Sequence, residues 1–433
     1  MICPSDLPSG KVLRELSIVE MLMTKWHVYA RGTSQIVMLM AIQGDLDLLR
    51  LQRVYETICL NEPALSAIVI QQADKWLLFR PDQPAKPLFV YGSFPKLSSG
   101  IEKFDRLLEA EVDNTLDIGH HLIRLTVLGE GKHYLLMLTL AHSIADAYIG
   151  KRLLSQLLCE TNVQIKSIVE IPEENEIQAE ESVDDVPSPP EYDVQQLAKR
   201  IHTQLNDAVK ALPPASDTLE TGLHSFVISS MVLKQLTYLA KQHQLSVNAL
   251  VTSLISQVMM DLLGLAVFKA VTALSYRNLF GAEITDVGCL IASSSALLAG
   301  DDVFENAHKI SQEILLSKQN FPQPRAINEK LQHLGEVMIT SRDQVIDYCS
   351  EVIFTNNGSI DKVRLPANLK LKAFRTVAAM PAGHVLTTFH IYFLYGQLFI
   401  STSYSKAIIS PEMMNKLVEN IRFRMFTFAF NEN

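Results

Sequence analysis

Runs of hydrophobic residues, separated by polar turns, fill the first half of the chain and predict a mixture of strands and helices. Apolar runs predict strands at 35–44, 64–70 and 75–79, and a strand pair, 121–128 and 133–142, across the turn from Gly129 to Lys132. Apolar residues at helical spacing predict helices at 101–112 and 147–158, and at 45–60 with Asp45 as the N-cap.

The second half has a comparable pattern. Helices are predicted at 231–242, from Ser246 onward, twice within 303–348, and at 411–428. Strands are predicted at 224–229, 270–276 and 288–298, and a sheet is completed by 352–358, 369–374, 384–396 and 397–404. Strands and helices do not alternate strictly, which disfavours a doubly wound parallel sheet. The predicted fold class is α+β, with two lobes of similar size.

The most hydrophobic stretch, Val247 to Leu274, is long enough to raise the question of a membrane span. Asp261 and Lys269 place charges inside it, and Gly264 divides it. A span needs about 20 mostly apolar residues. The pattern therefore favours a buried helix to Leu263 followed by a buried strand.

Charge changes the picture in one place. The net charge is −9, but ten acidic residues lie between Glu170 and Asp193 with four prolines and no lysine or arginine. Like charges repel and prolines extend a chain, so 169–195 is predicted to be a linker between lobes at 1–168 and 196–433. The rest is close to neutral and carries no basic patch, so nucleic acid is not an expected partner.

The five cysteines are scattered without a Cys-x-x-Cys pair, which disfavours a disulfide framework and a zinc site. We expect no metal and no bound organic cofactor. The first residues lack the pattern of a secretory signal, so a cytoplasmic location is expected.

Candidate chemistry gathers at the end of the strand 133–140. Its continuous apolar run indicates a strand buried on both faces, and Ala141-His142 ends it. A helix is expected to begin near Asp146, which places His142 in a strand-to-helix loop, where a histidine can act as a general base. The alternative is a hydrogen-bonded loop histidine with an N-capping aspartate. His120 and His121 are adjacent on a predicted strand and so point to opposite faces, which does not favour a metal site.

The segment HSIADAYIGKRLL, which begins at His142, resembles the HHxxxDG active-site motif of the chloramphenicol-acetyltransferase-like superfamily. That superfamily includes condensation domains of peptide synthetases and polyketide-associated acyltransferases of the phthiocerol dimycocerosyl transferase type. Ala141 replaces the first histidine of the motif and Ala147 its glycine. Further similar segments are EPALSAIVI, ALSYRNLF, VIFTNNGSID and the closing strand pair with its helix. No plant-type DFGWG signature and no attached carrier or adenylation segment is recognised, which favours the free-standing polyketide-associated branch.

The resemblance implies two lobes in a V with a tunnel between them, and an acyl group transferred from a CoA or carrier-protein thioester to an alcohol or amine. His142 would be the general base and Asp146 a structural residue paired with Arg277 or Arg124. Asn356 or Asn357 would shape the site or stabilise the oxyanion. The resemblance leaves open whether the product is an ester or an amide. The alternative function is a non-catalytic protein that binds an acylated carrier protein. We expect a monomer.

Overall fold

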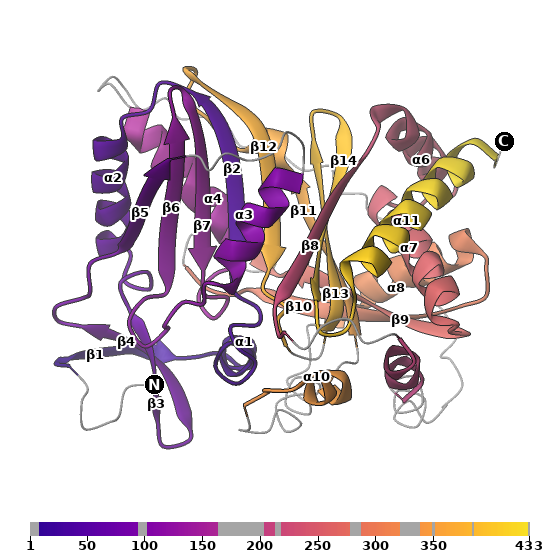
Figure 1. The fold of residues 1–433 in the computed structure, drawn as a ribbon, viewed down its shortest axis with the longest axis horizontal. Helices are drawn as coiled ribbons and strands as arrows, with labels where there is room; N and C mark the ends of the chain where they lie inside the picture. The colour runs from indigo at the N-terminus through magenta and orange to yellow at the C-terminus, as the bar shows by residue number, and fades with distance from the viewer. Residues whose placement is uncertain are drawn as a thin grey trace.

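The structure is a computed structural model that describes residues 8–93, 102–162, 203–212, 218–277, 287–320, 338–348, 351–382 and 385–431. Its two larger sheets stand side by side, with helices packed against them (Figure 1). The predicted α+β class is confirmed. The linker 169–195 and both lobe boundaries next to it lie outside the described residues.

The first lobe is built on a five-stranded sheet of order β12-β2-β7-β6-β5. Its strands are β2 (Ile36–Gly44), β5 (Leu88–Ser93), β6 (Ile123–Glu130), β7 (His133–Leu140) and β12 (Leu369–Ala378). A smaller sheet contains β1 (Gly10–Glu15), β3 (Ile68–Gln72) and β4 (Lys75–Pro81). The helices of this half are α1 (Ile18–Tyr29), α2 (Leu48–Asn61), α3 (Glu102–Asp113) and α4 (Ala147–Asn162).

The second lobe is built on a six-stranded sheet of order β10-β9-β11-β13-β14-β8. The strands are β8 (Thr221–Ile228), β9 (Val267–Ser275), β10 (Ile291–Ala299), β11 (Glu351–Ser359), β13 (Val385–Leu394) and β14 (Gln397–Ser405). The helical elements are α6 (Ser230–Gln242), α7 (Val247–Leu263), α8 (Val303–Asn320), α10 (Arg342–Tyr348), the 3₁₀ turn η3 (Ile360–Lys362) and α11 (Pro411–Asn431).

Local sequence accounts for the helix ends. The Ser246 side chain accepts a hydrogen bond from the backbone N–H of Ala249 and caps α7, and Gly264 ends that helix in the left-handed conformation, at φ 63°. The predicted cap of α2 is wrong by two residues. Asp47, not Asp45, accepts from the backbone N–H of Arg50, because β2 continues through Gly44 and the chain needs room to turn.

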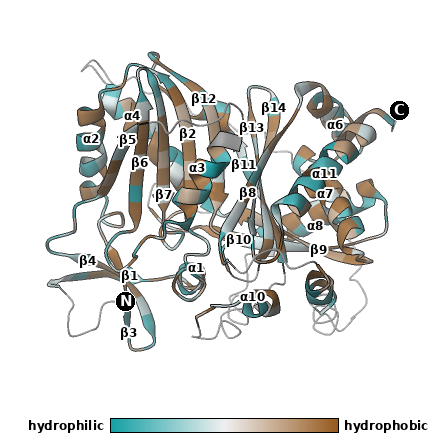
Figure 2. Cartoon of the chain, in the orientation of Figure 1, coloured by the Kyte–Doolittle hydropathy of each residue, from teal (hydrophilic) through white to brown (hydrophobic). Residues whose placement is uncertain are grey.

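The apolar stretch from Val247 divides, as predicted, into the buried helix α7 and the strand β9. No single helix among the described residues has the length and hydrophobicity to cross a membrane. The pair α6 and α7 would pass together by length and composition, but it is bent by 106°. Figure 2 shows hydrophobic and hydrophilic residues alternating along α2 and α11, as expected of helices with one buried face.

One strand lies in a different sheet from the one predicted. The segment 369–374 was expected in the sheet of the second half, but β12 pairs antiparallel with β2 in the first lobe, with Phe374 opposite Met40. In Figure 1 the orange β12 lies beside the indigo β2. The chain therefore leaves the second lobe after β11, adds a strand to the first, and returns as β13. This crossover connects the two lobes.

The two faces of β13 show how the lobes meet. Phe389 and Ile391 point into the core shared with α6, α7 and α11, whereas Tyr392 joins the core of the first lobe and packs on Phe374 at 5.5 Å between ring centroids. Successive strand residues point to opposite faces. From Phe389 onward the even-numbered residues of β13, including His390, therefore face the first lobe, whereas Leu386, beside the register irregularity at the start of the strand, belongs to the second core.

Candidate active site

His142 occupies the loop between β7 and α4, as predicted. β7 is the central strand of the five-stranded sheet, and six of its eight residues are buried, from Leu135 to Leu140. Such a strand is a rigid support, and the loop that follows it carries a partly buried His142. His120 and His121, by contrast, lie in the turn before β6 rather than on a strand, and His120 contacts Asp117.

The loop fixes the protonation of the two His142 nitrogens. Nδ1 lies 2.7 Å from the carbonyl oxygen of Ala145, which can only accept, so Nδ1 carries the hydrogen and donates it. In the neutral ring Nε2 is then the unprotonated nitrogen. Nε2 has no hydrogen-bond partner among the described residues, so its lone pair is left for another molecule.

Burial also favours the neutral form of this ring. Desolvation lowers the pKa of His142 below its ordinary value, and it outweighs the Ala145 carbonyl and the Asp146 carboxylate, which act in the opposite direction. At neutral pH the side chain is therefore an uncharged base.

Asp146 precedes α4 and links it to the second lobe. Its Oδ1 accepts from the backbone N–H of Ile149, and its Oδ2 lies 3.0 Å from Nε of Arg277. The two side chains are only 4% and 5% exposed, so this is a buried ion pair. Arg277 also donates to the carbonyl of Gly288 at 2.6 Å. Of the two arginines considered from the sequence, Arg277 is the one beside Asp146.

Arg124 lies in a different cluster. Its Nε donates to Glu111 at 2.8 Å, and the same carboxylate accepts from Thr126 and Thr139. This cluster joins α3 to β6 and β7 within the first lobe. Arg124 as a partner of Asp146 is therefore wrong, because its guanidinium is already paired with Glu111.

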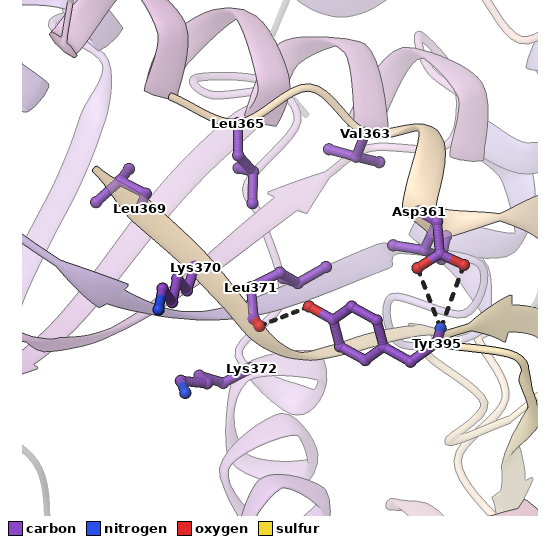
Figure 3. A pocket seen from close by; sticks show the side chains of 9 residues that line it. Asp361, Val363, Leu365, Leu369, Lys370, Leu371, Lys372 and Tyr395 are labelled. Carbon is purple, nitrogen blue, oxygen red and sulfur yellow. Dashed lines mark hydrogen bonds between the residues drawn. The ribbon is translucent and has the colours of Figure 1, made fainter. Parts of the chain in front are cut away.

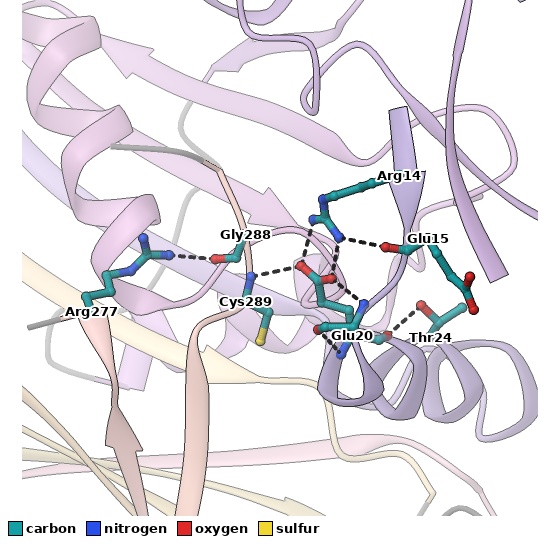
Figure 4. Close-up of polar contacts among 8 residues, drawn as sticks. Arg14, Glu15, Glu20, Thr24, Arg277, Gly288 and Cys289 are labelled. Atoms are coloured by element: carbon teal, nitrogen blue, oxygen red, sulfur yellow. Dashed lines mark hydrogen bonds and ion pairs between the residues drawn. The ribbon is translucent and has the colours of Figure 1, made fainter. Parts of the chain in front are cut away.

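A cysteine that sequence analysis did not single out touches the histidine. Cys289 Sγ lies 3.4 Å from Nδ1 of His142, and its backbone N–H donates to Glu20 at 3.2 Å. Glu20, on α1, is held in turn by Arg14 (Figure 4). Burial raises the pKa of the Cys289 thiol well above its usual range, with the Asp146 and Glu20 carboxylates adding to the effect. The group beside His142 is therefore a neutral thiol.

The two asparagines from the resemblance are already engaged. Asn356 is exposed and accepts from the backbone N–H of Gly358. Asn357 is buried. Its side-chain amide donates to the Thr355 hydroxyl at 3.2 Å, and its backbone carbonyl accepts from Lys151 Nζ at 2.6 Å. Burial lowers the pKa of Lys151. The backbone of Asn357 thus connects β11 to the first turns of α4, the helix that Asp146 precedes.

A second histidine, also missed in the sequence, faces the first lobe from β13. His390 is 5% exposed, and its Nε2 lies 3.1 Å from the Ser403 hydroxyl. Desolvation lowers the pKa of His390 to about 3, and the charge of His142 contributes in the same direction. In the sequence, the only sign of this residue was a single histidine inside the apolar run of 385–394.

Other features lie away from these histidines. A groove of about 510 Å³ is lined by Val363, Leu365 and Leu371 among other residues, and the Tyr395 hydroxyl donates to the Leu371 carbonyl beside it (Figure 3). Its lining includes neither His142 nor His390. Within the described residues, no three His, Cys, Asp or Glu side chains are placed to hold a metal ion.

Comparison with known proteins finds similarity in structure. No protein-family model matches the chain, and no curated protein matches it by sequence. The structure of polyketide synthase associated protein 5 from Mycobacterium tuberculosis matches over 98% of this chain and 100% of its own, at 17% identity and a TM-score of 0.65.

Two further solved structures extend the comparison. Trichothecene 15-O-acetyltransferase from Fusarium sporotrichioides matches over 99% of both chains, at 11% identity and a TM-score of 0.68. The first condensation domain of the CDA synthetase matches over 96% of this chain and 97% of its own, at 12% identity and a TM-score of 0.67. The chain therefore has the two-lobed fold of the chloramphenicol-acetyltransferase-like superfamily, as its HSIADAYIGKRLL segment predicts.

Proposed function

We propose that this protein is an acyltransferase that moves an acyl group from a CoA or carrier-protein thioester to a hydroxyl or amine acceptor, with His142 as the general base. The observation that carries the proposal is the hydrogen bond from His142 Nδ1 to the Ala145 carbonyl, which leaves Nε2 unprotonated and, within the described part of the chain, without a partner. The similarity to solved structures of an acetyltransferase and a condensation domain supports the same reaction class.

In this reaction Nε2 of His142 accepts the proton of the acceptor hydroxyl as its oxygen attacks the thioester carbonyl. The tetrahedral intermediate then loses the thiolate, which takes the proton from Nε2. The ester and the free thiol are the products, and the base returns to its neutral state. A positioned base of this kind accelerates a reaction by about 10²–10⁴-fold.

The buried pair of Asp146 and Arg277 has a supporting role in the proposal. It fixes the start of α4 against the second lobe, and with it the loop that carries His142. Neither side chain needs to touch a substrate. Their contribution is the position of Nε2 relative to whatever binds between the lobes.

The test is mass spectrometry of short-acyl and long-acyl thioesters, as CoA and carrier-protein adducts, incubated with pooled alcohols and amines. Wild type should consume thioester and form a new ester or amide, and His142→Ala should lose this activity while remaining folded. Product masses would distinguish ester from amide. A folded His142→Ala variant with full activity would refute the role of the base. Tight binding of a loaded carrier without acyl loss would favour a binding protein instead.

A further inference from the structure

His390 is a buried histidine that the proposed mechanism does not use. It lies on a strand whose other face points into the helical core of the second lobe. Its register partners are Thr355 on β11 and Ser401 on β14, so all three side chains stand on the face toward the first lobe. His390 therefore faces the first lobe, which carries His142, from a strand of the second.

Each of the two imidazoles uses one nitrogen on its own lobe. His142 Nδ1 is held by Ala145, and His390 Nε2 by the hydroxyl of Ser403. Among the described residues, His142 Nε2 and His390 Nδ1 have no hydrogen-bond partner. The rings are close enough for a charge on His142 to lower the pKa of His390. Thr355, the register partner of His390 on β11, accepts a hydrogen bond from Asn357. The backbone carbonyl of Asn357 accepts from Lys151 on α4, so the face that carries His390 lies against the helix that follows His142.

The chemistry of the two nitrogens is complementary when Ser403 donates to His390. His142 Nε2 is an acceptor, because Nδ1 carries its hydrogen. A hydroxyl can donate as well as accept, so Ser403 can give its hydrogen to His390 Nε2, and the neutral ring then carries its hydrogen on Nδ1. A ring held neutral by burial remains a donor without adding a second positive charge beside the imidazolium that forms at His142. A neutral imidazole can polarise a carbonyl in this way.

Neither asparagine has an amide placed to stabilise the oxyanion of acyl transfer. The Asn357 amide donates to Thr355, and Asn356 is exposed with its carbonyl oxygen bound to Gly358. Attack on a thioester places negative charge on the carbonyl oxygen, which a fixed donor would stabilise.

We propose that His390 is a second catalytic residue, whose Nδ1–H donates a hydrogen bond to the thioester carbonyl oxygen as it becomes an oxyanion, while His142 removes the proton of the acceptor. This inference rests on the proposed acyl transfer for its substrate class. It assigns to β13 the part that the resemblance gave to Asn356 or Asn357. No proton leaves His390 during the reaction.

The rate test compares a donor with non-donors at one position. His390→Gln keeps a neutral N–H donor and should retain kcat within about tenfold of wild type. His390→Leu has no donor and should lose about 10²–10³-fold in kcat with KM little changed. His390→Met is a second non-donor if the leucine variant does not fold. Equal kcat for the glutamine and leucine variants would overturn the proposal.

A second readout does not need transfer. The probe is octanoyl-pantetheine labelled with ¹³C at the carbonyl, and the measurement is the infrared carbonyl band of the bound probe. The band should lie at lower frequency with wild type and with His142→Ala than with His390→Leu. An unchanged band in His390→Leu overturns the inference even if transfer is observed.

The same measurement separates the two proposals. A shifted band in wild type without product from any acceptor would refute the transferase and leave His390 as the carbonyl donor of a thioester-binding site. Failure of wild type to bind the probe and every other thioester would overturn both.

Discussion

The pKa of His142 is set by opposing contacts within a few residues. Burial lowers it, and the Ala145 carbonyl and Asp146 carboxylate raise it by a smaller amount. Because the ring must be neutral to accept a proton, kcat/KM should rise from acid pH with an apparent pKa below the ordinary value of about 6.5. A pH profile of kcat/KM with a saturating acceptor measures this. An acid limb centred above 7 would contradict it.

The ion pair of Asp146 and Arg277 should be costly to break from one side. Arg277→Gln leaves a buried carboxylate without its cation, which typically costs about 3–5 kcal/mol in the free energy of unfolding. The matched control is Arg424→Gln, since Arg424 pairs with Asp261 where the side chains are 39% and 57% exposed. That change should cost less than about 1 kcal/mol. Urea denaturation of both variants is the measurement, and equal losses would contradict the assignment.

At the scale of elements, local sequence predicts what a segment becomes better than what it pairs with. The strand 133–140 and the loop at His142 could be placed because one continuous apolar run ends at a histidine. The segment LKLKAF reads correctly as a strand, but nothing local indicates that β12 pairs with β2. Arg277 and Arg124 were equivalent candidates for the same reason, since a buried ion pair depends on which elements meet.

His390 shows the same limit at the site. In a strand buried on both faces, a histidine reads as one polar residue in an apolar run. The role proposed for it depends on Ser403 on the neighbouring strand β14 and on His142, which lies in the loop before α4 and is far away in sequence. The motif at His142 could therefore be found from the sequence, whereas the contribution of the second lobe required the fold.

The crossing strand β12 should stabilise both lobes. Phe374 is fully buried and its ring packs edge-on against Tyr392 of β13, at an interplanar angle of 80°. Phe374→Ala should cost about 3–5 kcal/mol in the free energy of unfolding, because it leaves a cavity where the two lobes meet. Lys372→Ala, on the exposed face of the same strand, should change it by less than about 0.5 kcal/mol. Guanidinium unfolding followed by circular dichroism compares them; a loss below 1 kcal/mol for Phe374→Ala would contradict this view of β12.

Across the whole molecule, the seam between the lobes holds polar side chains as well as apolar ones. The Asp105 carboxylate on α3 accepts from the backbone and hydroxyl of Ser225 on β8, and the Ser225 hydroxyl also contacts Ser401. These contacts continue along the face of the second sheet that carries His390. The proposed site is therefore part of the interface, so changes that affect the site also affect how the lobes hold together.

The lowered pKa of His390 predicts how the stability of the whole protein depends on pH. The pKa of His390 is about 3 in the folded protein, against about 6.5 in an unfolded chain. Well above pH 6.5 the ring is neutral in both states, so its burial does not make the free energy of unfolding depend on pH. As the pH falls, the unfolded chain binds a proton that the folded protein does not, so stability is lost at about 1.4 kcal/mol per pH unit until the folded ring titrates.

His390→Gln removes this term alone. His27 and His142, whose pKa values are also lowered by burial, are present in both proteins and contribute equally to each. Between pH 7.5 and pH 5, wild type should therefore lose about 2 kcal/mol more stability than the variant. Urea unfolding at the two pH values gives the four free energies needed. Parallel losses in both proteins would mean that the pKa of His390 is the same in the folded and unfolded states, so that burial does not hold the ring neutral as we propose.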